Sequence, residues 1–237
     1  MIIRMIAVCL LILVCGAACG TDGPVTLKTL SHPGARPVRI EINPGANWIH
    51  VTPYNAAPQF AVWLEDLDGD YMDTVFVTAK SARQGWVFAD DDRKPGALPV
   101  WSHRRGVTYA DGLYMPVKED PLPDAITAAS PRAQCTIEFA PAPTGKKIRV
   151  FLEFNHSTDW NAAYRAGLAA DDPLHTIDVG QPSVVFTAEV DPSSPGTVLA
   201  RLAGKGSVTG TTGEIDANVN DLTTALHIVE SIRITVE

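Results

Sequence analysis

The sequence predicts an all-β fold, namely an antiparallel, immunoglobulin-like β-sandwich with long loops and one or two short helices. Three observations indicate this fold. The 237-residue chain contains 18 prolines and 18 glycines, which interrupt it at short intervals. The segments between these breaks alternate apolar with polar residues, as strands with one buried face do. Long stretches of helical periodicity are nearly absent, so a sandwich is the expected architecture.

The chain begins with a pattern typical of a bacterial lipoprotein signal. Arg4 precedes an uncharged apolar run over residues 5–14, which is too short for a bilayer-spanning helix of roughly 20 residues. The small residues 16–18 then lead into Cys19. We therefore predict cleavage before Cys19 and lipidation of its thiol. A plain signal peptide cleaved nearby, with Cys19 left as an ordinary thiol, is the alternative.

This pattern divides the chain into three parts. Residues 1–18 are the predicted signal peptide, residues 19–36 the lipidated N-terminus and linker, and residues 37–237 a single β-sandwich domain. Without the leader the chain keeps 18 basic and 27 acidic residues, a net charge of −9. Such a surface disfavours nucleic acid and anionic lipid headgroups, so membrane attachment depends on the acyl chains. The expected location is the bacterial cell envelope, on the periplasmic side or in the outer membrane.

The cysteines offer no disulfide. Cleavage removes Cys9 and Cys15 with the leader, and lipidation occupies Cys19. Cys135 then remains as one free thiol. It opens the alternating run CTIEF, so we expect it to be a small buried hydrophobe and not a nucleophile.

The first strands are expected at residues 37–42 and 47–51, followed by a hairpin over residues 60–79. In this hairpin Asp68-Gly69 suits the two central positions of a type I′ turn. That turn pairs Phe60 with Val77 and Trp63 with Thr74, and it leaves large apolar side chains on both faces. One face is expected to meet the second sheet, and the other to be covered by a loop or to bind a ligand.

The acidic residues of this hairpin invite a calcium-binding interpretation. An EF-hand loop starting at Asp66 needs glycine at its sixth position and glutamate at its twelfth, but Tyr71 and Val77 stand there. We therefore interpret these residues as turn formers.

Residues 79–123 are expected to wrap the sandwich in an extended conformation, with Trp86 and Trp101 as apolar contacts. A second hairpin is predicted over residues 135–154. Its inward set alternates with Arg149 and Glu153 and comprises Ile148, Val150, Leu152 and Phe154.

The remaining elements complete the predicted sandwich. Asp159 is expected to cap a short helix that ends at Leu168. Residues 182–190 and 196–204 are expected to form a strand pair. A one-turn helix capped by Asp221 and a closing strand that ends at Val236 finish the chain.

No nucleophile elbow, phosphate-binding glycine loop, paired metal-ligand histidines or CxxC motif is present in the sequence. We therefore expect a non-catalytic protein without a metal. The alternative is a metal-binding protein that uses the loop 155–178, in which His156 and His175 flank Asp159, Asp171 and Asp172. A solvated loop explains the same residues, and we favour it.

One short motif, DAITAAS at residues 124–130, resembles the signature at which bacterial flavin transferases attach FMN through a phosphoester. The resemblance makes Ser130 the acceptor and Asp124 and Thr127 recognition residues. Ala128 stands where glycine is usual, and its Cβ would obstruct a close approach to the backbone. A turn leading into the Cys135 strand is the simpler interpretation.

Four motifs, in order, resemble those of a predicted periplasmic protein family of unknown function: FAVWLEDLDGDYMDTVFV, LPVWSHRRG, DAITAAS and DLTTALHIVESIRITV. The resemblance extends over most of residues 37–237. It implies export, a compact β domain and an association with flavin transferases and PepSY-type membrane proteins. Our leading hypothesis is an envelope lipoprotein with a non-catalytic binding or accessory sandwich, whose partners are the membrane and envelope membrane proteins. The alternative is a redox carrier with covalent FMN at Ser130 and a flavin transferase as partner.

Overall fold

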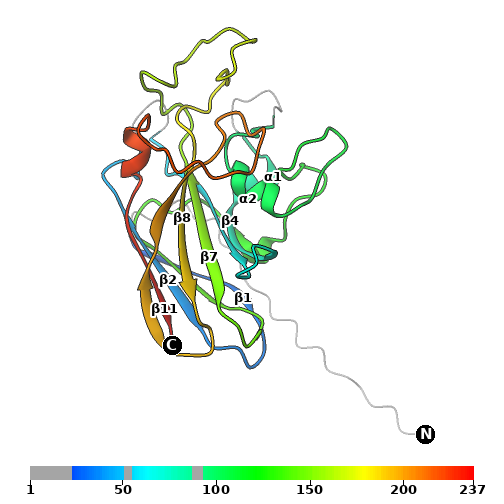
Figure 1. Cartoon of the computed structure of the whole chain (residues 1–237), viewed down its shortest axis with the longest axis vertical. Coiled ribbons are helices and arrows are strands. Elements are labelled where there is room, and N and C mark those ends of the chain that lie inside the picture. Colours follow the sequence, from blue (N-terminus) through cyan, green and yellow to red (C-terminus); the bar gives the residue numbers. More distant parts are fainter. Residues whose placement is uncertain (1–22, 51–54, 87–92) are drawn as a thin grey trace, which may run out of the picture.

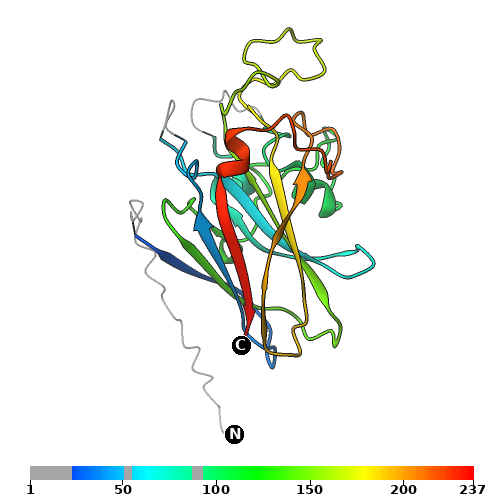
Figure 2. The same cartoon turned by 60° about the vertical axis from the view of Figure 1, so that its left-hand side comes forward.

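The strands form two sheets packed face to face, as the sequence predicts (Figures 1 and 2). The structure is a computed structural model that describes residues 23–50, 55–86 and 93–237. One sheet has five strands, in the order β1 (Val25–Ser31), β6 (Cys135–Ala140), β2 (Val38–Pro44), β11 (Val229–Val236) and β9 (Gly196–Leu199). The other has six, in the order β10 (Arg201–Lys205), β8 (Val184–Val190), β7 (Ile148–Asn155), β3 (Gln59–Glu65), β4 (Tyr71–Thr78) and β5 (Thr127–Ala128). The all-β sandwich with long loops and short helices is thereby confirmed.

Two strand pairs depart from the expected antiparallel order. β1 pairs with β6 in parallel, and β5 pairs with β4 in parallel. β1 lies within residues 19–36, which the sequence analysis assigns to a linker. Its residues Val25 and Leu27 pair with Cys135 and Ile137 at the sheet edge and pack on the core, so the sheet extends into that segment.

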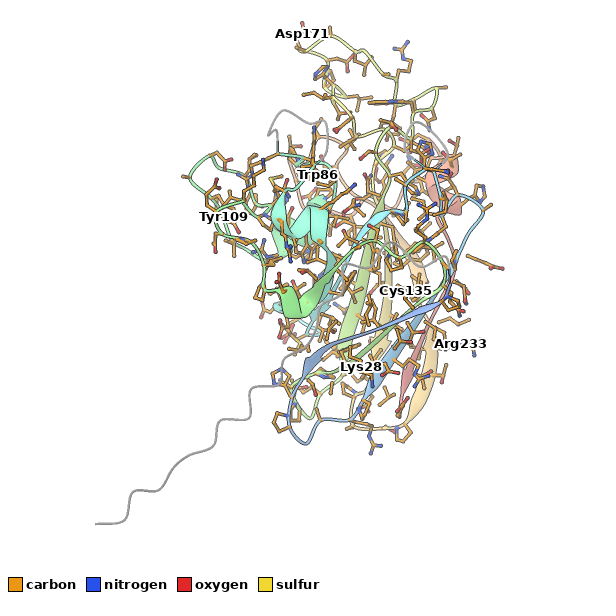
Figure 3. All side chains as sticks on the ribbon, turned by 180° about the vertical axis from the view of Figure 1, so that it is seen from behind. Lys28, Trp86, Tyr109, Cys135, Asp171 and Arg233 are labelled. Atoms are coloured by element: carbon orange, nitrogen blue, oxygen red, sulfur yellow. The ribbon has the colours of Figure 1, made fainter. Side chains whose placement is uncertain are left out.

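The core fills the space between the two sheets. Alternate residues of β2, β6 and β7 point into it, and Ile148, Val150, Leu152 and Phe154 are all buried as predicted. Phe60 stacks on Phe154 with ring centroids 5.2 Å apart. Cys135 is buried among these side chains (Figure 3), and desolvation raises the pKa of its thiol to about 12. The thiol is therefore protonated at neutral pH, which confirms that Cys135 is a buried hydrophobe.

The β3–β4 hairpin forms, but its turn differs from the prediction. A type I′ turn requires positive φ at both central residues, whereas only Gly69 of the Asp68-Gly69 pair has it, at +94°. The turn is held by Asp66, whose Oδ1 accepts hydrogen bonds from the backbone N–H groups of Asp68 and Asp70.

The strand register changes with this turn. Trp63 still pairs with Thr74, but two irregularities in the ladder shift the residues on either side, so Ala61 pairs with Val77. The predicted pairing of Phe60 with Val77 is therefore wrong by one residue. Bulges of this kind leave no periodic signal in the sequence.

One further predicted pairing is wrong and another is confirmed only in part, because strands that follow each other enter different sheets. β6 and β7 were expected to form a hairpin, but β6 lies in the five-stranded sheet and β7 in the six-stranded sheet. Residues 196–204 were expected to form one strand, but β9 pairs with β11 and β10 pairs with β8. The crossing occurs at Ala200.

The outer face of the six-stranded sheet is also apolar, and a long segment covers it. This segment includes α1 (Ala79–Arg83) and α2 (Pro99–Arg104), which lie against the sheet in Figure 1. Trp63 stacks on Phe151 on this face, with ring centroids 5.2 Å apart. Trp101 of α2 is buried against both, and its Nε1 donates to Thr74 Oγ1 at 3.0 Å. The wrapping segment is therefore confirmed, although it contains two short helices and Trp86 is only half-buried.

A buried carboxylate fixes α2 to the sheet. Glu153 of β7 belongs to the face opposite the inward set, yet it has no exposed surface. Its carboxylate accepts the backbone N–H of Val100 at 3.2 Å and that of Trp101 at 2.8 Å, and Ser183 Oγ donates to it at 2.5 Å. Glu153 thus satisfies N–H groups of the first turn of α2, which has no side-chain cap of its own.

The upper end of the sandwich in Figure 1 is built from loops. The predicted helix from Asp159 to Leu168 does not form. The predicted strand 47–51 is absent over residues 47–50, and Trp48 instead packs into the core. Residue 51 lies outside the described residues.

Two 3-10 turns and the last strand complete the chain. The turns are η1 (Asp124–Ile126) and η2 (Thr224–His227), and η2 leads into β11 as predicted. Asp221 makes no cap to η2, because its carboxylate binds Lys205. None of the helices within the described ranges has the length and apolar character needed to cross a bilayer.

Candidate functional site

A pocket of about 580 Å³ lies where the covering segment meets the upper loops, and we call it the rim pocket. Four segments line it: residues 93–96, Asp111 with Leu113, residues 175–179, and Val208 with Thr209. They are distant in sequence and converge only in the folded chain. The loop that provides residues 175–179 carries Asp171 at its projecting end (Figure 3).

Two glycines let the backbones of the pocket wall approach closely. A Cβ on Gly96 would lie 2.0 Å from the carbonyl oxygen of Val208. Gly210 has φ of +71°, and a Cβ there would lie 2.2 Å from the Pro95 carbonyl. The segments 93–96 and 208–210 are therefore held against each other in a way that no larger residue permits.

Ion pairs line the same pocket. Arg93 pairs with Asp111 and also donates to the Met115 carbonyl. Lys94 Nζ lies 3.0 Å from Asp178 Oδ2. The Arg93 hydrogen bond holds the pKa of Asp111 below its ordinary value, so Asp111 is ionised at neutral pH.

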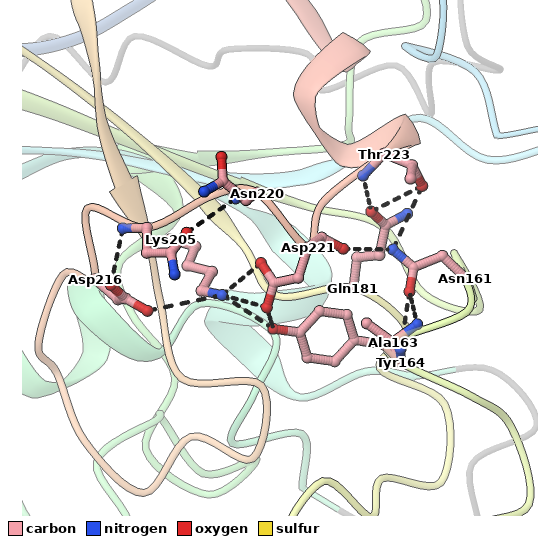
Figure 4. Close-up of polar contacts among 10 residues, drawn as sticks. Asn161, Ala163, Tyr164, Gln181, Lys205, Asp216, Asn220, Asp221 and Thr223 are labelled. Atoms are coloured by element: carbon pink, nitrogen blue, oxygen red, sulfur yellow. Dashed lines mark hydrogen bonds and ion pairs between the residues drawn. The ribbon is translucent and has the colours of Figure 1, made fainter.

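A buried lysine fastens the loops that form the pocket wall (Figure 4). Lys205 Nζ lies 2.6 and 2.5 Å from the two carboxylate oxygens of Asp221, and it donates to Tyr164 OH at 3.2 Å. Tyr164 OH in turn donates to Asp221 Oδ2 at 2.5 Å. Val208 and Thr209 lie between Lys205 and Asp221 in the sequence, so this cluster joins the two ends of the segment that carries them.

The charges of this cluster are mutually stabilised. Burial by itself lowers the pKa of Lys205 and raises that of Asp221. The hydrogen bonds and charge attraction among the three groups together outweigh burial: Asp221 and Tyr164 raise the pKa of Lys205, and Lys205 and Tyr164 lower the pKa of Asp221. Both groups are thus charged at neutral pH, and their partners are already in place. We assign the cluster to support of the pocket wall.

A second polar cluster lies beside the loop 155–178. The rings of His50 and His156 are 5.4 Å apart, and His50 Nδ1 lies 4.0 Å from Asp159 Oδ1. Asp159 Oδ1 also accepts the Thr224 hydroxyl at 2.5 Å, while its buried Oδ2 finds no hydrogen-bond donor among the described residues. Desolvation lowers the pKa of His156 to about 4, so its ring is neutral at neutral pH.

The predicted metal site in the loop 155–178 gains no structural support. His156 faces His50 and Asp159, whereas His175 lines the rim pocket and its Nδ1 contacts the Leu168 carbonyl at 2.8 Å. Asp172 Oδ1 accepts the Leu174 N–H within the loop. Over the described ranges, no group of three or more histidine, cysteine, aspartate or glutamate side chains is placed to hold a metal ion.

The residues of the predicted flavin motif lie at the edge of the six-stranded sheet. Ser130 Oγ accepts a hydrogen bond from Gln59 Nε2 at 3.1 Å and is half-buried. Thr127 pairs with Val77 in β5, and Asp124 is exposed and paired with Arg83. The motif is therefore an ordered edge turn, and its acceptor hydroxyl already contacts the sheet. The other predicted site residue, Cys19, lies outside the described residues.

Several residues of the rim pocket and its support could not be predicted from the sequence. Arg93 and Lys94 belong to a charged run that reads as a solvated loop, and nothing local distinguishes them. Lys205 gave a detectable signal, because it is a lysine within an otherwise strand-like apolar segment. A charged residue in such a segment is seldom buried unless it is paired with an oppositely charged or hydrogen-bonding group.

Searches of family models, curated proteins and solved structures found no match to this chain.

Proposed function

We propose that this chain is a lipid-anchored, non-catalytic binding protein of the bacterial cell envelope, and that the rim pocket is its ligand site. The pocket carries the proposal. Its volume of about 580 Å³ falls within the range of small-molecule sites, and it joins apolar walls to a few fixed polar groups. The support by Lys205 and by Gly96 keeps these walls in place without a ligand.

The anchor rests on the sequence pattern that ends at Cys19. Cys19 lies six residues before Val25, the first residue of β1, and six residues span at most about 20 Å. A lipid on Cys19 thus keeps the sandwich close to the membrane surface. Removal of the acyl chains would release it, because the negatively charged chain has little attraction to anionic lipids.

Radiolabelled palmitate tests the anchor. We expect the wild-type protein and the Cys135→Ala variant to incorporate the label in the native host, and the Cys19→Ala variant to incorporate none and to leave the membrane fraction. Cys135→Ala is the matched control, since it removes the buried thiol. Label on the Cys19→Ala variant would contradict the proposal.

The intact mass of the same membrane-derived protein decides the alternative, covalent FMN at Ser130. Ser130 lies at the sheet edge and is only half-buried, so a transferase would reach it once the hydrogen bond from Gln59 is broken. A yellow protein whose added flavin mass disappears in Ser130→Ala would support it. A colourless protein without that mass would exclude it.

Thermal melting with a panel of amines, carboxylates, amino acids and sugars tests the pocket. We expect at least one compound to raise the melting temperature by several degrees, because a ligand at about 100 times its Kd adds about 2.7 kcal/mol to the free energy of unfolding. Thr209→Trp should abolish this rise by filling the pocket. Thr197→Trp on β9 is the control and should retain it. A panel without any shift, or a shift that survives Thr209→Trp, would count against the proposed site.

A further inference from the structure

The two ion pairs of the rim pocket share one arrangement, in which the cation lies deeper than the carboxylate. The Arg93 side chain is 14% exposed and its partner Asp111 is 46% exposed. The Lys94 side chain is 7% exposed and its partner Asp178 is 31% exposed. A molecule that enters the pocket therefore meets the carboxylates before the cations.

Most of the Arg93 guanidinium is already bound by groups of the protein. Arg93 contacts Asp111 and the Met115 carbonyl, and its guanidinium lies 5.2 Å from the ring centroid of Tyr109. Its Nε has no hydrogen-bond partner among the described residues, but it is buried from solvent, so a ligand in the open pocket does not reach it. An anionic ligand would have to displace these contacts. A carboxylate, in contrast, has two oxygens with about four acceptor sites, so each aspartate can bind one cation inside and another outside.

The rest of the wall favours a hydrogen-bond donor with an aliphatic body. His175 directs Nδ1 to the Leu168 carbonyl, which leaves Nε2 as an acceptor in the neutral ring. Leu113, Val179 and Val208 provide apolar surface. Ile177 also lines the pocket and is 70% exposed, so an aliphatic ligand would remove its side chain from water.

We infer that the rim pocket binds an aliphatic organic cation, with an ammonium group against Asp111 or Asp178 and the carbon chain against Ile177 and its neighbours. This inference rests on the proposed function, because it assigns a ligand class to the same pocket. The net charge of the whole chain, −8, also favours the approach of cations.

Three probes with the same five-carbon chain separate the ligand classes: cadaverine, pentanediol and glutarate. We expect calorimetry at low ionic strength to show binding of cadaverine alone, with an affinity that falls as salt is added. Asp111→Asn should weaken cadaverine binding at least about tenfold, because it removes a charge-assisted contact. Asp171→Asn makes the same change on the projecting loop outside the pocket and should leave the affinity unchanged.

Asp111 is the better test residue, because Arg93 keeps its contacts with the Met115 carbonyl and the Tyr109 ring when Asp111 loses its charge, whereas Asp178→Asn would remove the carboxylate that neutralises the buried Lys94. Equal melting temperatures of the two asparagine variants and the wild type establish that folding is intact. Binding of glutarate or pentanediol that Thr209→Trp blocks would overturn the ligand class and leave the proposed function standing. Failure of cadaverine to bind, or equal binding by Asp111→Asn and Asp171→Asn, would also overturn the inference. The proposed function itself is contradicted only if no compound in the thermal-melting panel binds to the rim pocket.

Discussion

Glu153→Ala is expected to lower the free energy of unfolding by about 3–5 kcal/mol. The substitution leaves the backbone N–H groups of Val100 and Trp101 and the hydroxyl of Ser183 without their acceptor. Each unsatisfied buried group costs about 1–3 kcal/mol, and the lost side-chain volume leaves a cavity under α2. Urea unfolding at mildly acidic pH measures the loss.

Two further variants make this result specific. Glu153→Gln keeps one carbonyl acceptor and most of the volume, so its loss should be smaller. Glu189→Ala removes an exposed glutamate from the neighbouring strand β8 and should change little. If Glu153→Ala proved as stable as Glu189→Ala, the carboxylate would not hold α2 to the sheet.

The second large effect concerns pH. Desolvation raises the pKa of Glu153 to about 7 from an ordinary value of 4.5. Between these values the folded chain binds this proton more strongly than the unfolded chain, so the Glu153 contribution to stability falls as pH rises. Desolvation lowers the pKa of His156 to about 4 from 6.5. Between these two values the unfolded chain binds this proton more strongly than the folded chain, so the contribution of His156 to stability rises as pH rises.

Each residue changes the free energy of unfolding by about 3 kcal/mol between its two pKa values, and the two changes have opposite signs over most of the range from pH 4 to pH 7. We therefore expect them to compensate each other in the wild type. Glu153→Gln should become more stable as pH rises from about 4 to about 6.5, and His156→Gln should become less stable from about 4.5 to about 7. Urea unfolding across this range measures both slopes. Slopes equal to that of the wild type in both variants would refute the assignment.

Glu153 also shows where sequence reasoning stops. Alternation in β7 identifies Ile148, Val150, Leu152 and Phe154 as the core face, and the structure confirms it. The same alternation places Glu153 on the other face but does not reveal what covers that face. Phe151 on the same side was the available signal, since an apolar side chain beside a glutamate favours a covered surface. The cover itself comes from α1 and α2, which are distant in sequence from β7.

The sequence also does not predict which of the two sheets each strand joins. The sequence predicts the strands β2, β8 and β11 well, because local alternation determines them. It cannot distinguish a hairpin from a crossing between sheets. The predicted β6–β7 hairpin was therefore wrong, and of the predicted strand 196–204 only β10 pairs with β8, while β9 joins the other sheet. The rim pocket depends on such long-range placement, since its segments 93–96 and 208–209 are distant in sequence and meet only in the folded chain.

The short strands at the sheet edges have a consequence for contact between neighbouring copies of the chain. Unpaired strand edges invite further strands from neighbouring copies and so promote aggregation. Here β5 has two residues, β9 four and β10 five, and the seven-residue edge strand β1 carries Lys28 paired with Glu138. These outer strands themselves give neighbouring copies little backbone to extend, so they limit the addition of strands from another copy.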